Sequence, residues 1–289
     1  MTDATHSAAI PALAQAQSYP VIRLSPEVAS SAERWIAVEA PVAIEVNGLG
    51  YAVMMASPAG LVEFGTGFVF TEKLVATLDD LIDVTPHEVA QGWLLRIRVA
   101  EHCFAAVRER IRHRIADSGC GLCGLENLEQ ALRPLPMIET APLAEPSAIF
   151  AALAALPAAQ MLNRQTGAVH SAALCSAQGA IELAREDVGR HNAFDKLIGA
   201  ALLSGRAMDR GFVLLSSRCS YELVEKAAIA GVTMLVTISA PTSLAVERSK
   251  ACGLTLVSLA RADNVLVLND PHGLFTTTIP AADEMTAAK

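Results

Sequence analysis

Cys120 and Cys123 are the residues with the clearest chemical potential, because two thiols separated by two residues can act together. Such a pair can share a metal ion, close a disulfide or pass a sulfur atom between its thiols. The surrounding segment reads Ser-Gly-Cys-Gly-Leu-Cys-Gly from residue 118 to 124. Its glycines favour a loop, because glycine tolerates backbone angles that other residues avoid and weakens helices. The sequence therefore predicts a loop that can reach a partner.

Three chemistries stay open for this pair. A four-cysteine zinc site needs two more ligands, and a second copy would have to supply them because the chain has no other Cys-x-x-Cys. A dithiol redox switch lacks the thioredoxin pattern, in which the pair opens a helix. A sulfur carrier fits best, since a thiolate accepts a sulfane sulfur and a neighbouring thiol helps to release it. Basic residues that would favour the thiolate precede the loop: Arg108, Arg110, Arg112, His113 and Arg114.

A second group of polar residues occupies three loops, 186–192, 216–220 and 239–243, each between an expected strand and an expected helix. Ligands gather at this edge of open α/β sheets, and helix N-termini suit phosphate. Arginines can bind an anion with two hydrogen bonds. The loops therefore predict a nucleotide-like ligand, with candidate residues Arg190, His191, Arg218, Ser239 and Thr242.

Each of these loops also has a purely structural interpretation. Thr242 and Asp187 suit helix N-caps, and Asp195 lies four residues after His191, where the two could form a helix pair. His170, in an apolar strand, is typical of a core histidine. The presence of three such loops at one edge favours the ligand interpretation.

The elements that would position these residues form two groups. The first half predicts strands at 35–39, 42–46, 53–56 and 93–100, an Asn-Gly turn at 47–48, and helices at 61–71 and 105–115. The second half predicts a helix at 147–156 ended by Pro157, followed by strands at 168–175, 180–185, 212–215, 234–238 and 254–259 with helices between most of them. This alternation implies a mostly parallel sheet with helices on both faces.

We therefore expect a smaller α+β domain that carries the cysteine loop, followed by an α/β domain. The expected divisions are a disordered tail 1–19, the α+β domain 20–124, a proline-rich connector 125–146, the α/β domain 147–279 and a tail 280–289.

Composition restricts the class of protein. The net charge of −8 and pI near 5.4 argue against broad nucleic-acid binding. No apolar run approaches the ~18 residues of a membrane span, and the start lacks signal-peptide character. The sequence thus predicts a cytoplasmic protein without a disulfide framework, in which Cys175 and Cys252 are buried and inert.

Several motifs together resemble the formate dehydrogenase accessory sulfurtransferases, the FdhD/NarQ family. The resemblance runs from about Glu39 to Leu268. The motifs that carry it are the glycine-rich cysteine loop, Thr-Gly-Ala-Val-His at 166–170, Glu-Asp-Val-Gly-Arg-His-Asn-Ala at 186–193 with Asp195 and Lys196, Ser-Tyr-Glu-Leu-Val at 220–224 with Lys226, and Ser-Ala-Pro-Thr-Ser-Leu-Ala-Val at 239–246.

The resemblance implies a sulfurtransferase that accepts sulfur from a cysteine desulfurase as a persulfide on Cys120, with Cys123 as its partner thiol. The sulfur would pass to the molybdenum cofactor, bis-molybdopterin guanine dinucleotide, for the catalytic subunit of formate dehydrogenase. It also implies a homodimer and a three-layer α/β/α second domain like cytidine deaminase, without zinc. The cofactor-binding segment would be Leu259, Ala260, Arg261, Ala262, Asp263 and Asn264.

Two other functions stay open. One is a non-enzymatic cofactor chaperone in which the cysteines are structural or mediate dimer contacts. The other is a zinc-dependent nucleotide deaminase, which the lack of a Pro-Cys-x-x-Cys motif near Cys219 disfavours.

Overall fold

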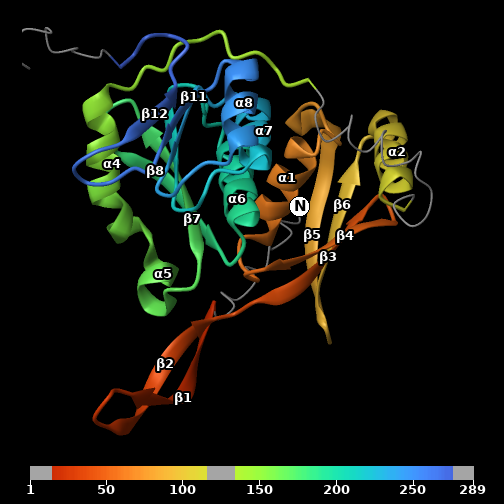
Figure 1. The fold of residues 1–289 in the computed structure, drawn as a ribbon. Coiled ribbons are helices and arrows are strands. Elements are labelled where there is room, and N and C mark those ends of the chain that lie inside the picture. Colours follow the sequence, from red (N-terminus) through yellow and green to blue (C-terminus); the bar gives the residue numbers. More distant parts are fainter. Residues whose placement is uncertain (1–14, 116–133, 276–289) are drawn as a thin grey trace, which may run out of the picture.

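The computed structural model describes residues 15–115 and 134–275 (Figure 1). These residues form a two-stranded arm, a four-stranded sheet with its helices, and a six-stranded sheet with helices on both faces. Cys120 and Cys123 lie outside the described residues. Within the described ranges, none of the helices has the length and apolar character needed to cross a membrane.

The arm projects from the body of the molecule (Figure 1). It consists of β1 (Ala16–Leu24) and β2 (Ala29–Ala37), which pair antiparallel along their whole lengths. The prediction of a disordered tail up to residue 19 is therefore wrong for residues 16–19, which belong to β1. Ile22 and Leu24, near the tip of the arm, are 78% and 79% exposed, whereas Ala16 at its base is buried against Leu162 and Val169.

The four-stranded sheet has the order β4-β3-β6-β5. Its strands are β3 (Ala40–Val46), β4 (Leu49–Ala56), β5 (Leu81–Val89) and β6 (Gly92–Val99). Asn47 and Gly48 both have positive φ, 47° and 81°, as the predicted tight hairpin requires. Helix α1 (Leu61–Thr71) has the predicted bounds, and α2 (Phe104–Ile115) begins one residue earlier than expected. Two 3-10 turns, η1 (Leu78–Asp80) and η2 (Glu101–Cys103), flank this sheet.

The six-stranded sheet has the order β12-β11-β10-β9-β7-β8. Its strands are β7 (His170–Ser176), β8 (Ile181–Asp187), β9 (Gly211–Leu215), β10 (Met234–Thr237), β11 (Thr255–Ser258) and β12 (Leu266–Asn269). Its helices are α4 (Pro146–Ala159), α5 (Met161–Thr166), α6 (Arg190–Leu203), α7 (Tyr221–Ile229) and α8 (Ser243–Cys252).

The prediction of a mostly parallel sheet is wrong. β9, β10 and β11 run parallel, but β7 pairs antiparallel with both β8 and β9, and β12 pairs antiparallel with β11. The hairpin between β7 and β8 reverses the chain at one side of the sheet, and the return of β12 reverses it at the other. The sheet is mixed for this reason.

Helix α4 also departs from the prediction, because it continues past Pro157 to Ala159. Pro157 lies in the last turn, where a proline removes a single backbone bond. The amide of Gln160 still donates to the carbonyl oxygen of Leu156 at 3.1 Å, so the turn closes after the proline.

Helices cover both faces of the six-stranded sheet (Figure 1). Alternate residues of a strand point to opposite faces. In β9, Val213 and Leu215 pack into the cluster that includes α6, α7 and α8, while Phe212 and Leu214 pack against α4. The likeness of this domain to cytidine deaminase stays a prediction.

Helix α1 of the first sheet packs directly against α6 of the second through two glycines. A Cβ added to Gly67 would lie 1.9 Å from the carbonyl oxygen of Asp195, and one added to Gly199 would lie 1.9 Å from that of Glu63. The two helices therefore meet backbone to backbone. This close contact between α1 and α6 positions the first sheet relative to the second.

Candidate functional site

Four strand ends meet at one edge of the six-stranded sheet. Since β8 and β9 are both antiparallel to β7, they run in the same direction, and β10 and β11 run parallel to β9. Hydrogen bonds between backbone atoms join the loops: the amide of Ser216 donates to Ser171 at 3.0 Å, and that of Ser239 donates to Ser217 at 3.3 Å. The amide of Leu259 donates to Ser239 at 3.4 Å. The predicted loops are therefore neighbours in space.

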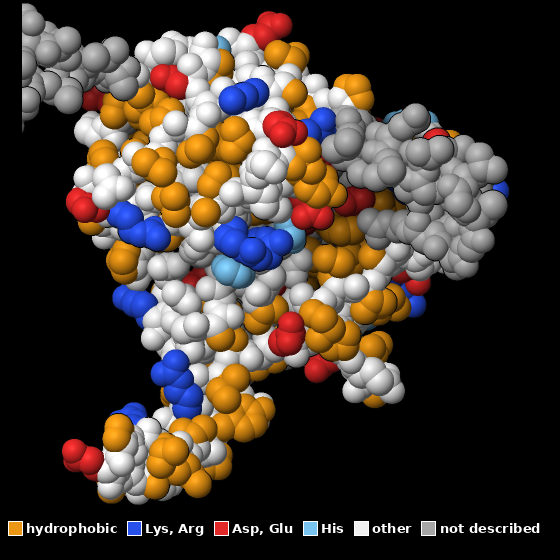
Figure 2. All heavy atoms as spheres, viewed as in Figure 1, with side chains coloured by type: hydrophobic (Ala, Val, Ile, Leu, Met, Phe, Trp, Pro, Cys, Tyr) orange, Lys and Arg blue, Asp and Glu red, His pale blue; other side chains and the backbone are white. Residues whose placement is uncertain are grey.

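A group of basic side chains occupies this edge. The pKa of His170 is lowered by burial and then by the positive charges of Arg190, His191 and Arg218, while Asp187 opposes the shift. Arg190, His191 and Arg218 are thus each close enough to His170 to act on it. Figure 2 shows Lys/Arg and His side chains gathered near the middle of one face. In a protein of net charge −8, this local concentration of positive charge suits an anion.

Arg190 is the first residue of α6, and its Nε is buried without a hydrogen-bond partner among the described residues. Arg218 is exposed in the loop between β9 and α7. A guanidinium nitrogen that is removed from water without a partner is costly unless another group supplies an acceptor. Anion oxygens are suitable acceptors for such a donor.

His191 is held by the start of α7. Its Nε2 lies 2.9 Å from Oε2 of Glu222 and 3.2 Å from Oγ of Ser220. The hydrogen bond with His191 lowers the pKa of Glu222, and Ser220 contributes further. The expected pair of His191 with Asp195 is therefore wrong. Glu222 was not predicted at this edge; its place two residues after the Ser220 cap position was the available signal.

Thr242 caps helix α8, because its Oγ1 accepts a hydrogen bond from the amide of Ala245 at 3.2 Å. The structural interpretation of this hydroxyl is thus confirmed. The hydroxyl accepts in this cap and so keeps its own hydrogen to donate, beside the free backbone amides at the start of α8. Ser239 contributes backbone hydrogen bonds to the edge.

The segment 259–264 follows β11 at the same edge. Leu259 has a φ of 52°, a conformation rare for a branched side chain and often found at functional sites. Arg261 donates through its guanidinium to the carbonyl oxygens of Ile238 and Ala260. Its backbone amide donates to Asn264 at 2.8 Å and closes a turn. Ala262 and Asp263 are exposed on this turn, as is Asn264.

Asp187, which was expected to cap a helix, is fully buried and forms an ion pair. Nζ of Lys196 lies 2.5 Å from its Oδ2, and the amide of Ser57 donates to the same oxygen at 3.0 Å. Oδ1 accepts from the amide of Gly189 at 2.8 Å and from Nδ2 of Asn192 at 3.0 Å. The carboxylate therefore ties the loop after β8 to the chain after β4.

Asp195 forms a second buried contact between the two sheets. Its carboxylate accepts from Nζ of Lys226 at 2.7 and 2.9 Å and from Oγ1 of Thr71 at 2.9 Å. Lys226 comes from α7 and Thr71 from the end of α1. Several charged residues of the 186–196 motif thus hold the fold together, whereas Arg190 and His191 remain at the edge.

The cysteines of the second domain are unreactive. Cys175 and Cys219 are buried, and burial raises the pKa of each thiol to about 12. A thiol with so high a pKa holds almost no thiolate near neutral pH. The buried state predicted for Cys175 and Cys252 is confirmed.

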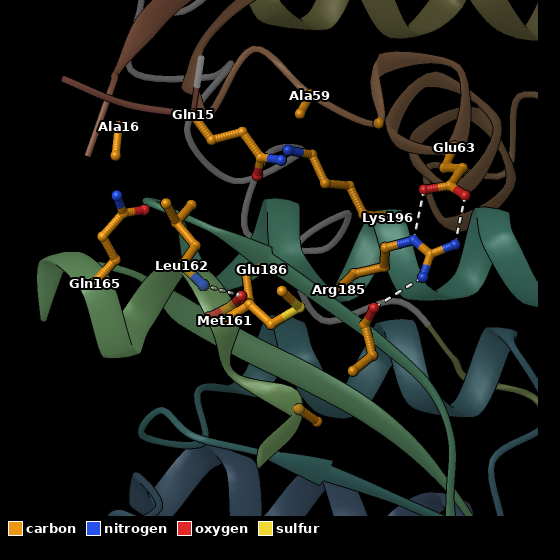
Figure 3. Close-up of a pocket in the computed structure, with 13 residues that line it drawn as sticks. Gln15, Ala16, Ala59, Glu63, Met161, Leu162, Gln165, Arg185, Glu186 and Lys196 are labelled. Carbon is orange, nitrogen blue, oxygen red and sulfur yellow. Dashed lines mark hydrogen bonds and ion pairs between the residues drawn. The ribbon is translucent and has the colours of Figure 1, made fainter. Parts of the chain in front are cut away.

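A cavity of about 670 Å³ lies elsewhere, between the base of the arm, α1, α5 and β8. Figure 3 shows Arg185 and Glu63 facing each other at its wall, where Nε and one terminal nitrogen of Arg185 each donate to the carboxylate at 2.6 Å. Glu186 accepts from the amides of Leu162 and Asn163 at the start of α5. The predicted cofactor residues, all of them in the described ranges, do not line this cavity.

Comparisons with known proteins give a consistent result. The model of the FdhD/NarQ family matches residues 37–275. The sulfur carrier protein FdhD of Burkholderia cenocepacia is 45% identical over 249 residues, 84% of this chain and 90% of that protein. The sulfur carrier protein FdhD of Variovorax paradoxus is 41% identical over 83% of this chain and 86% of its own.

A crystal structure from Desulfotalea psychrophila, described as that of a formate dehydrogenase accessory protein, has a similar fold. Its TM-score is 0.69 at 24% identity, and the match covers 90% of this chain and 99% of that chain. At this identity the match supports the fold.

Proposed function

This chain belongs to the FdhD/NarQ family, and we propose that it is a sulfur carrier that serves formate dehydrogenase. The observation that carries the proposal is the match to relatives named sulfur carrier protein FdhD over more than four fifths of both chains. The Cys-x-x-Cys pair supplies the chemistry that such a carrier needs.

The sulfur step begins with the Cys120 thiolate, which attacks the outer sulfur of a persulfide on a cysteine desulfurase. The donor's S–S bond breaks, the donor cysteine leaves as a thiolate, and Cys120 becomes a persulfide. Cys123 assists release: its thiolate attacks the inner sulfur of Cys120, a disulfide forms, and the outer sulfur leaves as hydrosulfide for the acceptor. A thiol reductant then restores both cysteines.

The acceptor we propose is the molybdenum cofactor, bis-molybdopterin guanine dinucleotide, bound as a substrate at the sheet edge. Arg190 and Arg218 would bind its phosphates, with the amides at the starts of α7 and α8 as further donors. The segment 259–264 would contact the same ligand. The unpartnered Nε of Arg190 and the cationic surroundings of His170 support this assignment.

The partners in this proposal are a cysteine desulfurase and the catalytic subunit of formate dehydrogenase, with a homodimer in the cytoplasm as the working form. The alternative is a non-enzymatic chaperone that holds the cofactor. One observation favours keeping it: none of the candidate cofactor residues at the sheet edge is a cysteine, so cofactor binding there needs no thiol.

Intact mass spectrometry after incubation with a cysteine desulfurase and cysteine tests the carrier role. We expect the protein to gain about 32 Da, the mass of one sulfur atom, because a thiolate is the acceptor. Cys120→Ala should abolish the gain. Cys123→Ala should keep the persulfide but slow its release to a thiol acceptor. If an active desulfurase adds no sulfur to the wild-type protein, the chaperone function replaces the carrier function.

The affinity of the edge for guanosine diphosphate should increase as the pH falls. In the free protein, burial and neighbouring cations hold the pKa of His170 below its ordinary value of 6.5. A bound anion neutralises those cations and raises the pKa, so binding is accompanied by proton uptake. Affinity therefore rises as the pH falls through the imidazole range, and it levels off once His170 is also protonated in the free protein.

Isothermal titration calorimetry at a series of pH values measures this dependence. His170→Gln is the matched control, because it retains the titration of the nucleotide's own phosphate and removes that of the imidazole. A pH dependence identical in the two proteins would contradict the prediction.

A further inference from the structure

Three potential metal ligands lie together at one end of the four-stranded sheet. Asp80, His102 and Cys103 each offer one ligand atom, and these atoms all lie within 4.8 Å of one another. The sheet brings them together because β5 begins at Leu81 and β6 ends at Val99, which pair with each other. The turns η1 and η2, which carry the three residues, are therefore adjacent although they are 20 residues apart in the chain.

Backbone hydrogen bonds hold this arrangement in place. Oδ2 of Asp80 accepts from the amides of Ala76 and Thr77 at 2.9 and 3.0 Å. The amide of Ala100 donates to the carbonyl oxygen of Asp80 at 2.8 Å, and that of Cys103 donates to Ala100 at 3.0 Å. The positions of the acidic residue and of the thiol are thus set by the fold.

The remaining donor atoms face one another. Oδ1 of Asp80 lies 2.9 Å from Nε2 of His102. Since the backbone amides donate to Oδ2, that oxygen can keep its hydrogen bonds while Oδ1 binds a cation. Hydrogen bonds from the Thr77 and Ala76 amides lower the pKa of Asp80, which keeps the carboxylate ionised. Cys103 is 8% exposed, whereas the side chain of His102 is 72% exposed.

We propose that Asp80, His102 and Cys103 bind a Zn²⁺ ion, with water at the fourth position. Zinc accepts carboxylate oxygen, imidazole nitrogen and thiolate sulfur, and three protein ligands plus water is a common arrangement. Ligand atoms around tetrahedral zinc are roughly 3.3–3.8 Å apart, as follows from the usual zinc–ligand distances. The three ligand atoms already lie within 4.8 Å of one another, so small side-chain rotations of His102 and Cys103 would bring them to that spacing. Mg²⁺ and Ca²⁺ bind weakly to a site with a thiolate ligand, because both ions prefer oxygen ligands.

Zinc binding releases one proton to solvent, because Cys103 must ionise to bind the metal. The bond formed joins zinc to the thiolate sulfur, and no redox change is involved. The bound ion would link η1 to η2, directly before α2, and so restrain the start of the helix that precedes the cysteine loop. This site is independent of the proposed sulfur transfer.

Cobalt titration of the full-length Cys120→Ala/Cys123→Ala protein tests the proposal, since this background removes the other thiol pair. We expect one equivalent of Co²⁺ to produce a thiolate-to-cobalt charge-transfer band with the strong visible absorption of tetrahedral cobalt, and Zn²⁺ to abolish both. Cys103→Ser should eliminate the band. His102→Ala should weaken binding by at least about tenfold.

Two variants serve as matched controls. His87 is an exposed histidine on the same sheet, and Cys252 is a buried thiol in the other domain. His87→Ala and Cys252→Ser should leave the titration unchanged. If Cys103→Ser does not fold, as judged by circular dichroism, the exposed His102 decides the question. Absence of the band, or a band that His102→Ala leaves at full affinity, would overturn the proposal.

Discussion

Gly199→Ala is expected to destabilise the protein by at least about 3 kcal/mol, at or beyond the upper end of ordinary overpacking costs. The added Cβ would lie 1.9 Å from the carbonyl oxygen of Glu63 and 2.9 Å from the amide nitrogen of Gly67. Both are backbone atoms, so no side-chain rotation relieves the clash. Helices α1 and α6 must move apart, which also disturbs the buried ion pairs on either side of the contact.

Urea unfolding followed by circular dichroism measures the change in the free energy of unfolding. Gly67→Ala should behave similarly, because its Cβ would meet the carbonyl oxygen of Asp195 at 1.9 Å. Gly50→Ala is the matched control: it lies in β4, and its Cβ would have no described atom within 4 Å. Gly199→Ala with the same unfolding midpoint as Gly50→Ala would show that the helices are not in backbone contact.

Lys196→Met is expected to lower the free energy of unfolding by about 3–5 kcal/mol, because it leaves a buried carboxylate without its cation. Asp187 is fully buried, and Lys196 is 1% exposed. Nζ of Lys196 also donates to the carbonyl oxygen of Ser57 at 2.9 Å, so the substitution removes a second contact between the sheets. Methionine has a similar length, which limits the contribution of a cavity.

Two further variants make this measurement specific. Arg206→Met removes a partner of Glu182 from an exposed ion pair, with side chains 46% and 40% exposed, and should cost less than about 1 kcal/mol. Asp187→Asn combined with Lys196→Met should recover part of the loss, because no uncompensated charge then remains. Equal losses for Lys196→Met and Arg206→Met would contradict the expected role of the buried pair.

Local sequence patterns predicted most helices and the central strands. The Asn-Gly turn at 47–48 and the apolar run at 61–71 carry their own signals, because turn chemistry and helical periodicity act over a few residues. β1, β5 and β12 were missed. All three have mostly exposed or half-buried residues, so the hydrophobic alternation that reveals a strand is weak in them.

The sheet edge was predicted in outline, since strand-to-helix loops in an α/β pattern gather at one edge. The roles of individual residues were less accessible. Thr242 caps a helix, as its structural interpretation predicted. Asp187 and Asp195, however, pair with residues that no local pattern indicates. Their hydrogen-bond partners Ser57 and Thr71 lie more than 120 residues earlier in the chain.

The sequence alone determined the family, the cysteine pair and the order of most elements, because each depends on residue types at short spacing. Tertiary structure decided which charged residues of the 186–196 motif are buried between the two sheets and which remain at the edge. It also brought Asp80 next to Cys103 through the pairing of β5 with β6. Such contacts depend on how distant segments pack, and short-range patterns carry no information about that packing.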